Sequence, residues 1–183
     1  MKTKRIALCA VLMAMALGLS YMERFLPLQL VVPLPGVKLG LANIVTLMAL
    51  CFLGGRTAVT VLVLRCFLGS VFGGGVTALA FSLTGGLLAL VTMVAARRLP
   101  FLSVYGVSIL GAAAHNIGQI LAAMAVLKSV TVASYLPFLL VVSIATGMIT
   151  GAAAGGTFRA LLASGQRSVL PGPIPHFRKN PEV

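Results

Sequence analysis

The chain has 183 residues, of which 60% are hydrophobic and only 9% are charged, and its mean hydropathy is +1.11. A soluble domain carries about 25% charged residues, so this composition excludes an ordinary soluble protein and indicates an integral membrane protein. The net charge of +12 comes from 14 Lys and Arg against two Asp and Glu. Because most of these basic residues stand at the ends of apolar runs, the charge indicates membrane orientation rather than nucleic-acid binding.

Six apolar runs follow one another, separated by gaps that contain Gly or Pro. Each crossing of a bilayer needs about 20 apolar residues, so the chain has the length for six. We therefore predict an all-α membrane protein with a six-helix transmembrane domain over residues 1–163 and a disordered, Pro-rich tail over 164–183. The predicted helices cover residues 6–21, 37–53, 57–72, 76–96, 103–127 and 134–162.

The distribution of Lys and Arg predicts the orientation of these helices. With the N-terminus inside, ten basic residues fall on the inner side and three on the outer side. Such an excess is typical of the cytoplasmic face. We therefore expect both termini in the cytoplasm and a multi-pass protein of the cell membrane. The three outer residues are Arg24, Lys38 and Lys128.

The first predicted helix has small residues at four-residue spacing, Ala10, Ala14 and Gly18, and the sixth predicted helix has a similar row of glycines. Such rows let helix backbones approach closely, because lipid provides no hydrophobic drive for helix association. Two interpretations stay open for each row. The row packs against another helix of this chain, or it docks a second membrane protein. The glycines of the sixth helix are Gly147, Gly151 and Gly155.

The second predicted helix opens with "PGVKLGLANIV", which places Lys38 and Asn43 in an apolar run. Pro35 suits the first turn of a helix, where a missing N–H costs little. The free N–H groups of a helix start favour anions, and Lys38 would add a full charge there. We expect Lys38 near the outer entrance of a binding site and Asn43 a turn deeper, beneath a loop at residues 23–35. The alternative for Lys38 is an interfacial anchor.

Arg65 stands near the middle of the third predicted helix, where a charge costs about 2.5–3.5 kcal/mol on insertion scales. Its natural partner would be a carboxylate, and the whole chain offers only Glu23 and Glu182. Glu23 could reach a pocket or pair with Arg24. An anionic ligand would satisfy Arg65 through charge-assisted hydrogen bonds. The alternatives are snorkelling of the side chain to an interface, or hydrogen bonds to backbone carbonyls.

The fifth predicted helix carries three polar residues close together, His115, Asn116 and Gln119, in "AAHNIGQI". Residues 115 and 119 share a helix face, and 116 lies beside them. Their small neighbours leave room for a ligand or for a closely packed helix. We predict that they belong to the same site as Arg65; an interhelical hydrogen-bond network is the alternative.

Three segments, "PGVKLGLANIVTL", "GGRTA" and "LRCFLGS", resemble the Gx transporter family, also labelled heptaprenyl diphosphate synthase component I. That family is related to the substrate-binding S components of energy-coupling factor (ECF) transporters, and the likeness covers about residues 5–160. It implies an S-component-like bundle that captures a small anionic or polar-headed solute, related to a vitamin, a cofactor or an isoprenoid, from outside. It also implies partners, namely a transmembrane T subunit and two ATP-binding subunits. Ala10 and Ala14 match the stripe by which S components contact the T subunit.

Catalysis by this chain is not expected. It has no GxxxxGK[ST] phosphate loop for ATP, and it has no Asp with which to hold the Mg²⁺ that prenyl elongation needs. Its three cysteines lack metal-ligand spacing, so we expect neither a metal nor a cofactor. The alternatives to a transport subunit are a non-catalytic membrane subunit of a prenyl diphosphate synthase and a purely structural protein. The cysteines are Cys9, Cys51 and Cys66.

Overall fold

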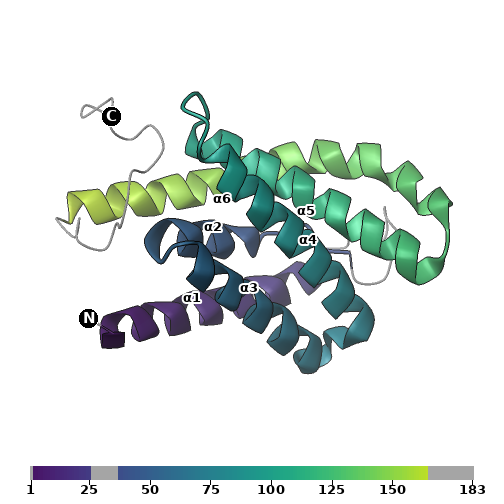
Figure 1. Cartoon of the computed structure of the whole chain (residues 1–183), viewed down its shortest axis with the longest axis horizontal. Coiled ribbons are helices and arrows are strands. Elements are labelled where there is room, and N and C mark those ends of the chain that lie inside the picture. Colours follow the sequence, from purple (N-terminus) through teal and green to yellow (C-terminus); the bar gives the residue numbers. More distant parts are fainter. Residues whose placement is uncertain (1, 26–36, 165–183) are drawn as a thin grey trace.

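The computed structural model describes residues 2–25 and 37–164, and all regular structure in these ranges is helical (Figure 1). This agrees with the predicted all-α class. The segment 26–35 of the predicted loop and the tail beyond Ser164, including Glu182, lie outside the described residues. The six α-helices are α1 (Lys2–Met22), α2 (Asn43–Phe52), α3 (Gly55–Gly69), α4 (Gly75–Ala96), α5 (Val104–Leu127) and α6 (Leu136–Ala163).

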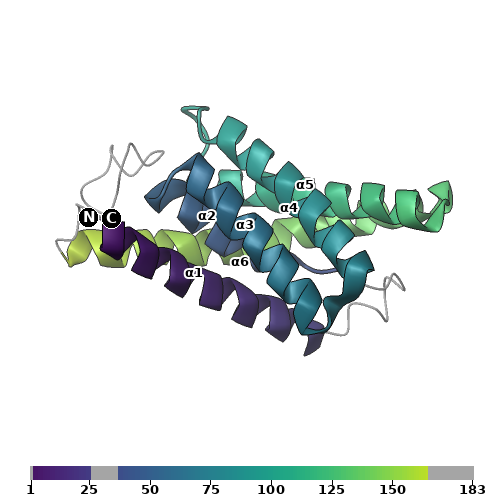
Figure 2. The same ribbon diagram turned by 60° about the horizontal axis from the view of Figure 1, so that its bottom comes forward.

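Successive helices run in opposite directions along the bundle (Figures 1 and 2). The beginnings of α1, α3 and α5 lie at one end, together with the end of α6. The connections at this end carry Arg56 in the first turn of α3 and Arg97 and Arg98 after α4. One end of the bundle is therefore enriched in basic residues, although the side of the membrane that it faces stays a prediction.

Four helical segments are long and apolar enough to cross a membrane. Two further helical stretches, Ile6–Met22 and Asn43–Phe52, are apolar but shorter. The protein is thus a multi-pass helical membrane protein, while the count of six crossings is not established by helix length alone. The four long segments are Gly55–Phe72, Gly75–Ala96, Val104–Leu127 and Val130–Ala160.

The second helix differs most from the prediction, because it begins at Asn43 rather than at residue 37. Residues 37–40 have no regular structure, and Gly40 has a left-handed φ of 81°, which stops the helix from extending backwards. Lys38 therefore does not lie in the first turn of a helix, and the predicted anion site at a helix start there is wrong. Ten helical residues span only about 15 Å, about half of a hydrocarbon core.

Helix α2 is enclosed by the rest of the bundle, since nine of its ten residues are buried. Phe52 at its end packs edge-to-face on Phe158 of α6, with ring centroids 5.2 Å apart. The guanidinium of Arg97 donates a hydrogen bond to the carbonyl oxygen of Leu50 at 3.3 Å. The end of α2 is thus held by α6 and by the basic turn after α4.

Helix α5 packs most extensively on α4 and α6, and glycines permit this close approach. A Cβ atom built on Gly118 of α5 would lie 2.7 Å from the Cα atom of Gly85 in α4. One built on Gly147 of α6 would lie 2.5 Å from the Cα atom of Ile109 in α5. The glycine row of α6 therefore packs within this chain at Gly147 and Gly151, whereas a Cβ on Gly155 would meet nothing within 4 Å.

We expect Gly147→Ala to lower the free energy of unfolding of the purified protein by about 1–3 kcal/mol, because the added methyl group overlaps the α5 backbone. Gly156→Ala, in the same helix, is the matched control. Its Cβ would meet nothing within 4 Å, so the better helix propensity of Ala should leave stability unchanged or raise it slightly. Thermal unfolding in detergent measures both variants, and equal melting temperatures would contradict the packing described.

Candidate functional site

Polar side chains of other elements bind part of the backbone of the irregular segment 37–42, whose carbonyls at 40–42 accept from the first N–H groups of α2. The backbone N–H of Lys38 donates to Oε1 of Gln119 at 2.7 Å, and Nε2 of Gln119 donates to the Lys38 carbonyl at 2.8 Å. The N–H of Leu41 donates to Oε1 of Glu23, which lies in the short 3₁₀ turn η1 (Glu23–Phe25) after α1. Gln119 and Glu23 thus hold this segment between α5 and the end of α1.

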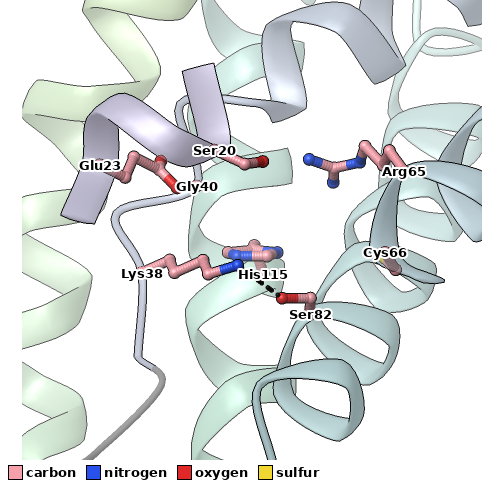
Figure 3. A pocket seen from close by; sticks show the side chains of 8 residues that line it. All are labelled: Ser20, Glu23, Lys38, Gly40, Arg65, Cys66, Ser82 and His115. Carbon is pink, nitrogen blue, oxygen red and sulfur yellow. Dashed lines mark hydrogen bonds between the residues drawn. The ribbon is translucent and has the colours of Figure 1, made fainter. Parts of the chain in front are cut away.

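A small polar cavity lies beside this segment (Figure 3). Five elements contribute to it: the end of α1, segment 37–42, α3, α4 and α5. Its free volume is about 10 Å³, which is room for about one water molecule. Its walls carry charged and hydroxyl groups as well as an imidazole. The lining residues are Ser20, Glu23, Lys38, Gly40, Arg65, Cys66, Ser82 and His115.

Two cationic side chains and one carboxylate face this cavity. Arg65 is 6% exposed and donates from its Nη2 to Oδ1 of Asn43 at 3.1 Å, while its Nε has no hydrogen-bond partner. Lys38 is half-buried, and its Nζ donates to the hydroxyl of Ser82 at 3.3 Å. Glu23 is 7% exposed. With one negative charge against two positive ones, the charges that line the cavity favour an anion.

Glu23 experiences opposing influences on its ionisation. The pKa of its carboxyl is raised, because the effect of burial exceeds the lowering by the N–H of Leu41 and by the positive charges of Arg65 and Lys38. One of its oxygens is already occupied by the Leu41 N–H. Glu23 therefore contributes to the shape of segment 37–42 as well as to the charge of the cavity.

His115 is buried between two glycines that leave space only for its ring. A Cβ atom on Gly40 would lie 2.7 Å from Cδ2 of His115, and one on Gly85 would lie 2.9 Å from its Nδ1. Nδ1 has no hydrogen-bond partner of normal geometry, although the backbone of Gly85 is close. The ring is held by shape, and its Nδ1 lies buried against Gly85.

The predicted site residues separate into two groups. Arg65, His115, Lys38 and Glu23 line one cavity, and Asn43 adjoins it through its hydrogen bond to Arg65. The other two predicted residues, Asn116 and Gln119, are not among the lining residues.

Asn116 and Gln119 instead connect parts of the bundle. Nδ2 of Asn116 donates to the Leu139 carbonyl at 3.0 Å and to the Ser143 hydroxyl at 2.8 Å, both in α6. Gln119 bonds the backbone of Lys38. For these two residues the geometry agrees with the alternative of a network between structural elements.

Several lining residues were not predicted from the sequence. Ser20 could have been found, because it lies three positions before Glu23 and so shares its side of the α1 end. Cys66 follows Arg65 directly but has no sequence signal of its own. Gly40 became recognisable only through its positive φ and its contact with the His115 ring.

An apolar groove adjoins the cavity between α1 and the end of α3. Its volume is about 450 Å³, and it shares Ser20 and Lys38 with the polar cavity. One wall of the groove is made by α1. The opposite wall is made by the end of α3 and by the π-helical turn η3 (Ser70–Gly74), which connects α3 to α4. The remaining lining residues are Leu17, Gly18, Tyr21, Gly69 and Phe72.

The predicted docking residues Ala10, Ala14 and Gly18 are all exposed along one side of α1. Larger exposed side chains flank them, Val11 at 56% and Met15 at 44%. Gly18 also borders the apolar groove, and a Cβ built on it would meet nothing within 4 Å. Unlike the glycines of α6 at 147 and 151, this row is not used for packing inside the described part of the chain.

We expect Gly40→Ala to destabilise the protein more than Gly54→Ala does. Both glycines have a positive φ, 81° and 86°, so both variants bear backbone strain. Only at Gly40 would the methyl group also collide with His115, since nothing lies within 4 Å of a Cβ on Gly54. The difference between their melting temperatures in detergent measures the His115 contact. Adding His115→Ala to the Gly40→Ala variant should recover part of the loss, and an absence of any recovery would contradict the contact.

Comparison with known proteins adds one finding. A family model described as heptaprenyl diphosphate synthase component I matches residues 12–157, which is most of the chain. The comparisons with curated proteins and with solved structures found no match. The matched range extends from α1 into α6 and contains every residue that lines the polar cavity. The protein therefore belongs to the heptaprenyl diphosphate synthase component I family, the family that its sequence resembles.

Proposed function

We propose that the protein is the substrate-binding integral membrane subunit of an ECF-type importer, which captures a small anionic or polar-headed solute from outside the cell. The observation that carries this proposal is the cavity in which Arg65 and Lys38 outnumber Glu23. A buried arginine whose Nε has no partner is costly in a membrane protein unless a ligand uses it. Such residues in transmembrane bundles typically mark a substrate path.

The position of the cavity supports capture from outside. The cavity is lined by residues near the ends of α1 and α3, in the first half of α4 and midway along α5. The ends of α1 and α3 and the beginning of α4 lie at the end of the bundle away from the basic turns (Figures 1 and 2). Under the positive-inside rule the basic end would face the cytoplasm, so the cavity would lie in the outer half of the membrane.

The exposed small-residue face of α1 supports a partner. In this proposal Ala10, Ala14 and Gly18 dock the T subunit, which in turn couples to two ATP-binding subunits. ATP hydrolysis is assigned to the partners, because the chain itself has neither an ATP phosphate loop nor an Asp-rich magnesium site. The chain would then bind the solute while its partners hydrolyse ATP.

A second candidate function is that of a non-catalytic membrane subunit of a prenyl diphosphate synthase. The family description and the apolar groove of about 450 Å³ beside the polar cavity favour it. In that case the chain would hold the lipid-like product or precursor for a soluble, Asp-rich enzyme.

We expect Arg65→Gln to weaken binding of the anionic solute about ten- to hundredfold, which corresponds to the loss of a hydrogen bond to a charged group. Native mass spectrometry of gently purified protein should detect a small molecule on the unmodified chain and much less of it on the variant. Arg159→Gln, an exposed residue near the end of α6, is the matched control and should retain the molecule. Equal retention by Arg65→Gln, in a variant that melts normally, would remove Arg65 from the proposed site.

We expect the combined Ala10→Leu and Ala14→Leu variant to stay folded but to lose most of its co-purifying T and ATP-binding subunits. Both positions are exposed, and leucine side chains there would keep a second helix from approaching closely. The matched control is Ala152→Leu with Ala153→Leu, two exposed positions on α6. Affinity purification from host membranes with quantitative mass spectrometry compares them. Full retention of partners would contradict the docking face, and recovery of an Asp-rich synthase instead would favour the second candidate.

A further inference from the structure

We infer that the ligand is a single-chain amphiphile, with a small anionic head in the polar cavity and an aliphatic chain in the apolar groove between α1 and α3. This inference rests on the proposed function, since it names the substrate class of the same site. To the importer proposal it adds the hydrophobic part of the ligand and its entry from the side of the bundle.

The two volumes decide where most of the ligand lies. The polar cavity of about 10 Å³ has room for little more than one water molecule. Sites for whole small molecules are typically about 300–1,000 Å³, a range that the adjoining groove of about 450 Å³ meets and the cavity does not. The cavity therefore suits only a small polar group, whereas the bulk of the molecule belongs in the groove.

The charges around the cavity identify the chemistry of the head. Arg65 lines the cavity and has a buried Nε without a hydrogen-bond partner, and Lys38 lines both the cavity and the groove. A carboxylate or phosphate would add negative charge beside these two cations and would accept hydrogen bonds from Arg65. Ser20 also lines both spaces, so the polar and apolar parts of the site are continuous.

The groove provides a surface for an aliphatic chain. Tyr21 is 57% exposed and Phe72 is 68% exposed, and both present aromatic rings along it. Gly18 and Gly69 have no side chains to narrow the groove, and a Cβ atom on either would meet nothing within 4 Å. A wholly polar solute would gain nothing from these surfaces, while an aliphatic chain gains about 0.8 kcal/mol for each buried CH₂. Because the walls are exposed faces of α1 and of the α3–α4 turn, the chain can enter from the bilayer.

The experiment uses the full-length protein in nanodiscs of phosphatidylcholine. The sequence has no tryptophan, so a Phe72→Trp variant places one fluorescent reporter in the groove. We expect dodecyl phosphate to shift its emission saturably, at one molecule per protein. Inorganic phosphate should cause no shift at the same concentration, and dodecyltrimethylammonium, which has the same chain and a cationic head, should cause no saturable shift.

Two further variants in the Phe72→Trp background test the two parts of the site. Arg65→Gln removes the head contact and should weaken the apparent affinity at least tenfold. Gly69→Leu adds a side chain to the groove at a residue that does not line the polar cavity, and it should weaken the affinity to a similar degree. Gly156→Leu on α6, where a Cβ also meets nothing, is the control and should bind normally. Gly69→Leu keeps the inference testable if Arg65→Gln fails to fold.

The outcomes separate this inference from the proposed function. If calorimetry shows that inorganic phosphate binds as tightly as dodecyl phosphate, the inference is wrong while capture of a small anion stands. If every amphiphile gives the same non-saturable response whatever its head, the groove contacts annular lipid only and the inference is wrong. A failure of the importer proposal appears elsewhere, in the absence of ATP-binding partners from the purified complex.

Discussion

The structure depends on one constraint, that a stretch of irregular backbone inside an apolar bundle must find its hydrogen bonds within the protein. Where water is absent, each unsatisfied backbone group costs several kcal/mol, so irregular chain at membrane depth occurs only where protein or a cavity surrounds it. Segment 37–42 is such a stretch. The amide of Gln119 pairs with both backbone groups of Lys38, and the carboxylate of Glu23 receives the Leu41 N–H. Two polar side chains therefore replace the helix that the backbone does not form.

This constraint explains why the polar residues of the bundle differ in what they can offer a ligand. Asn116 and Gln119 use their amides to join α5 to α6 and to Lys38, so most of their polar atoms already have partners within the protein. Arg65 and His115 each keep an unsatisfied nitrogen beside the cavity. Broken helices near the middle of a membrane commonly form substrate sites, because the break supplies space and directional polar groups. Here the irregular segment before the short α2 contributes Lys38 and Gly40 to the cavity wall.

Hydropathy predicted most of the helices, because four of them are long apolar runs and α1 contains a shorter one. The beginning of α2 could not be found in this way. "PGVKLGLANIV" has the composition of a helix start, but residues 37–40 have no regular structure, and there Gly40 lies against the His115 ring and the backbone of Lys38 pairs with Gln119. Similarly, helical periodicity placed His115 and Gln119 on one face but could not show that one lines a cavity while the other holds backbone. Such outcomes depend on which element packs opposite, and local pattern does not contain that information.

The small residues of α4 and α5 affect both the packing of these helices and the shape of the polar cavity. Gly118 lets the backbones of the two helices touch at Gly85, and Gly85 in turn leaves room for the His115 ring. If α4 stood farther from α5, Ser82 and His115 would move apart and the polar cavity would open to the neighbouring groove. If the helices were closer to α3, the 3.5 Å between a Cβ on Gly86 and Nη2 of Arg65 would disappear and Arg65 would be displaced. These glycines therefore have a packing role and a functional role at once, because the distance that they set between the helices also determines the size of the cavity.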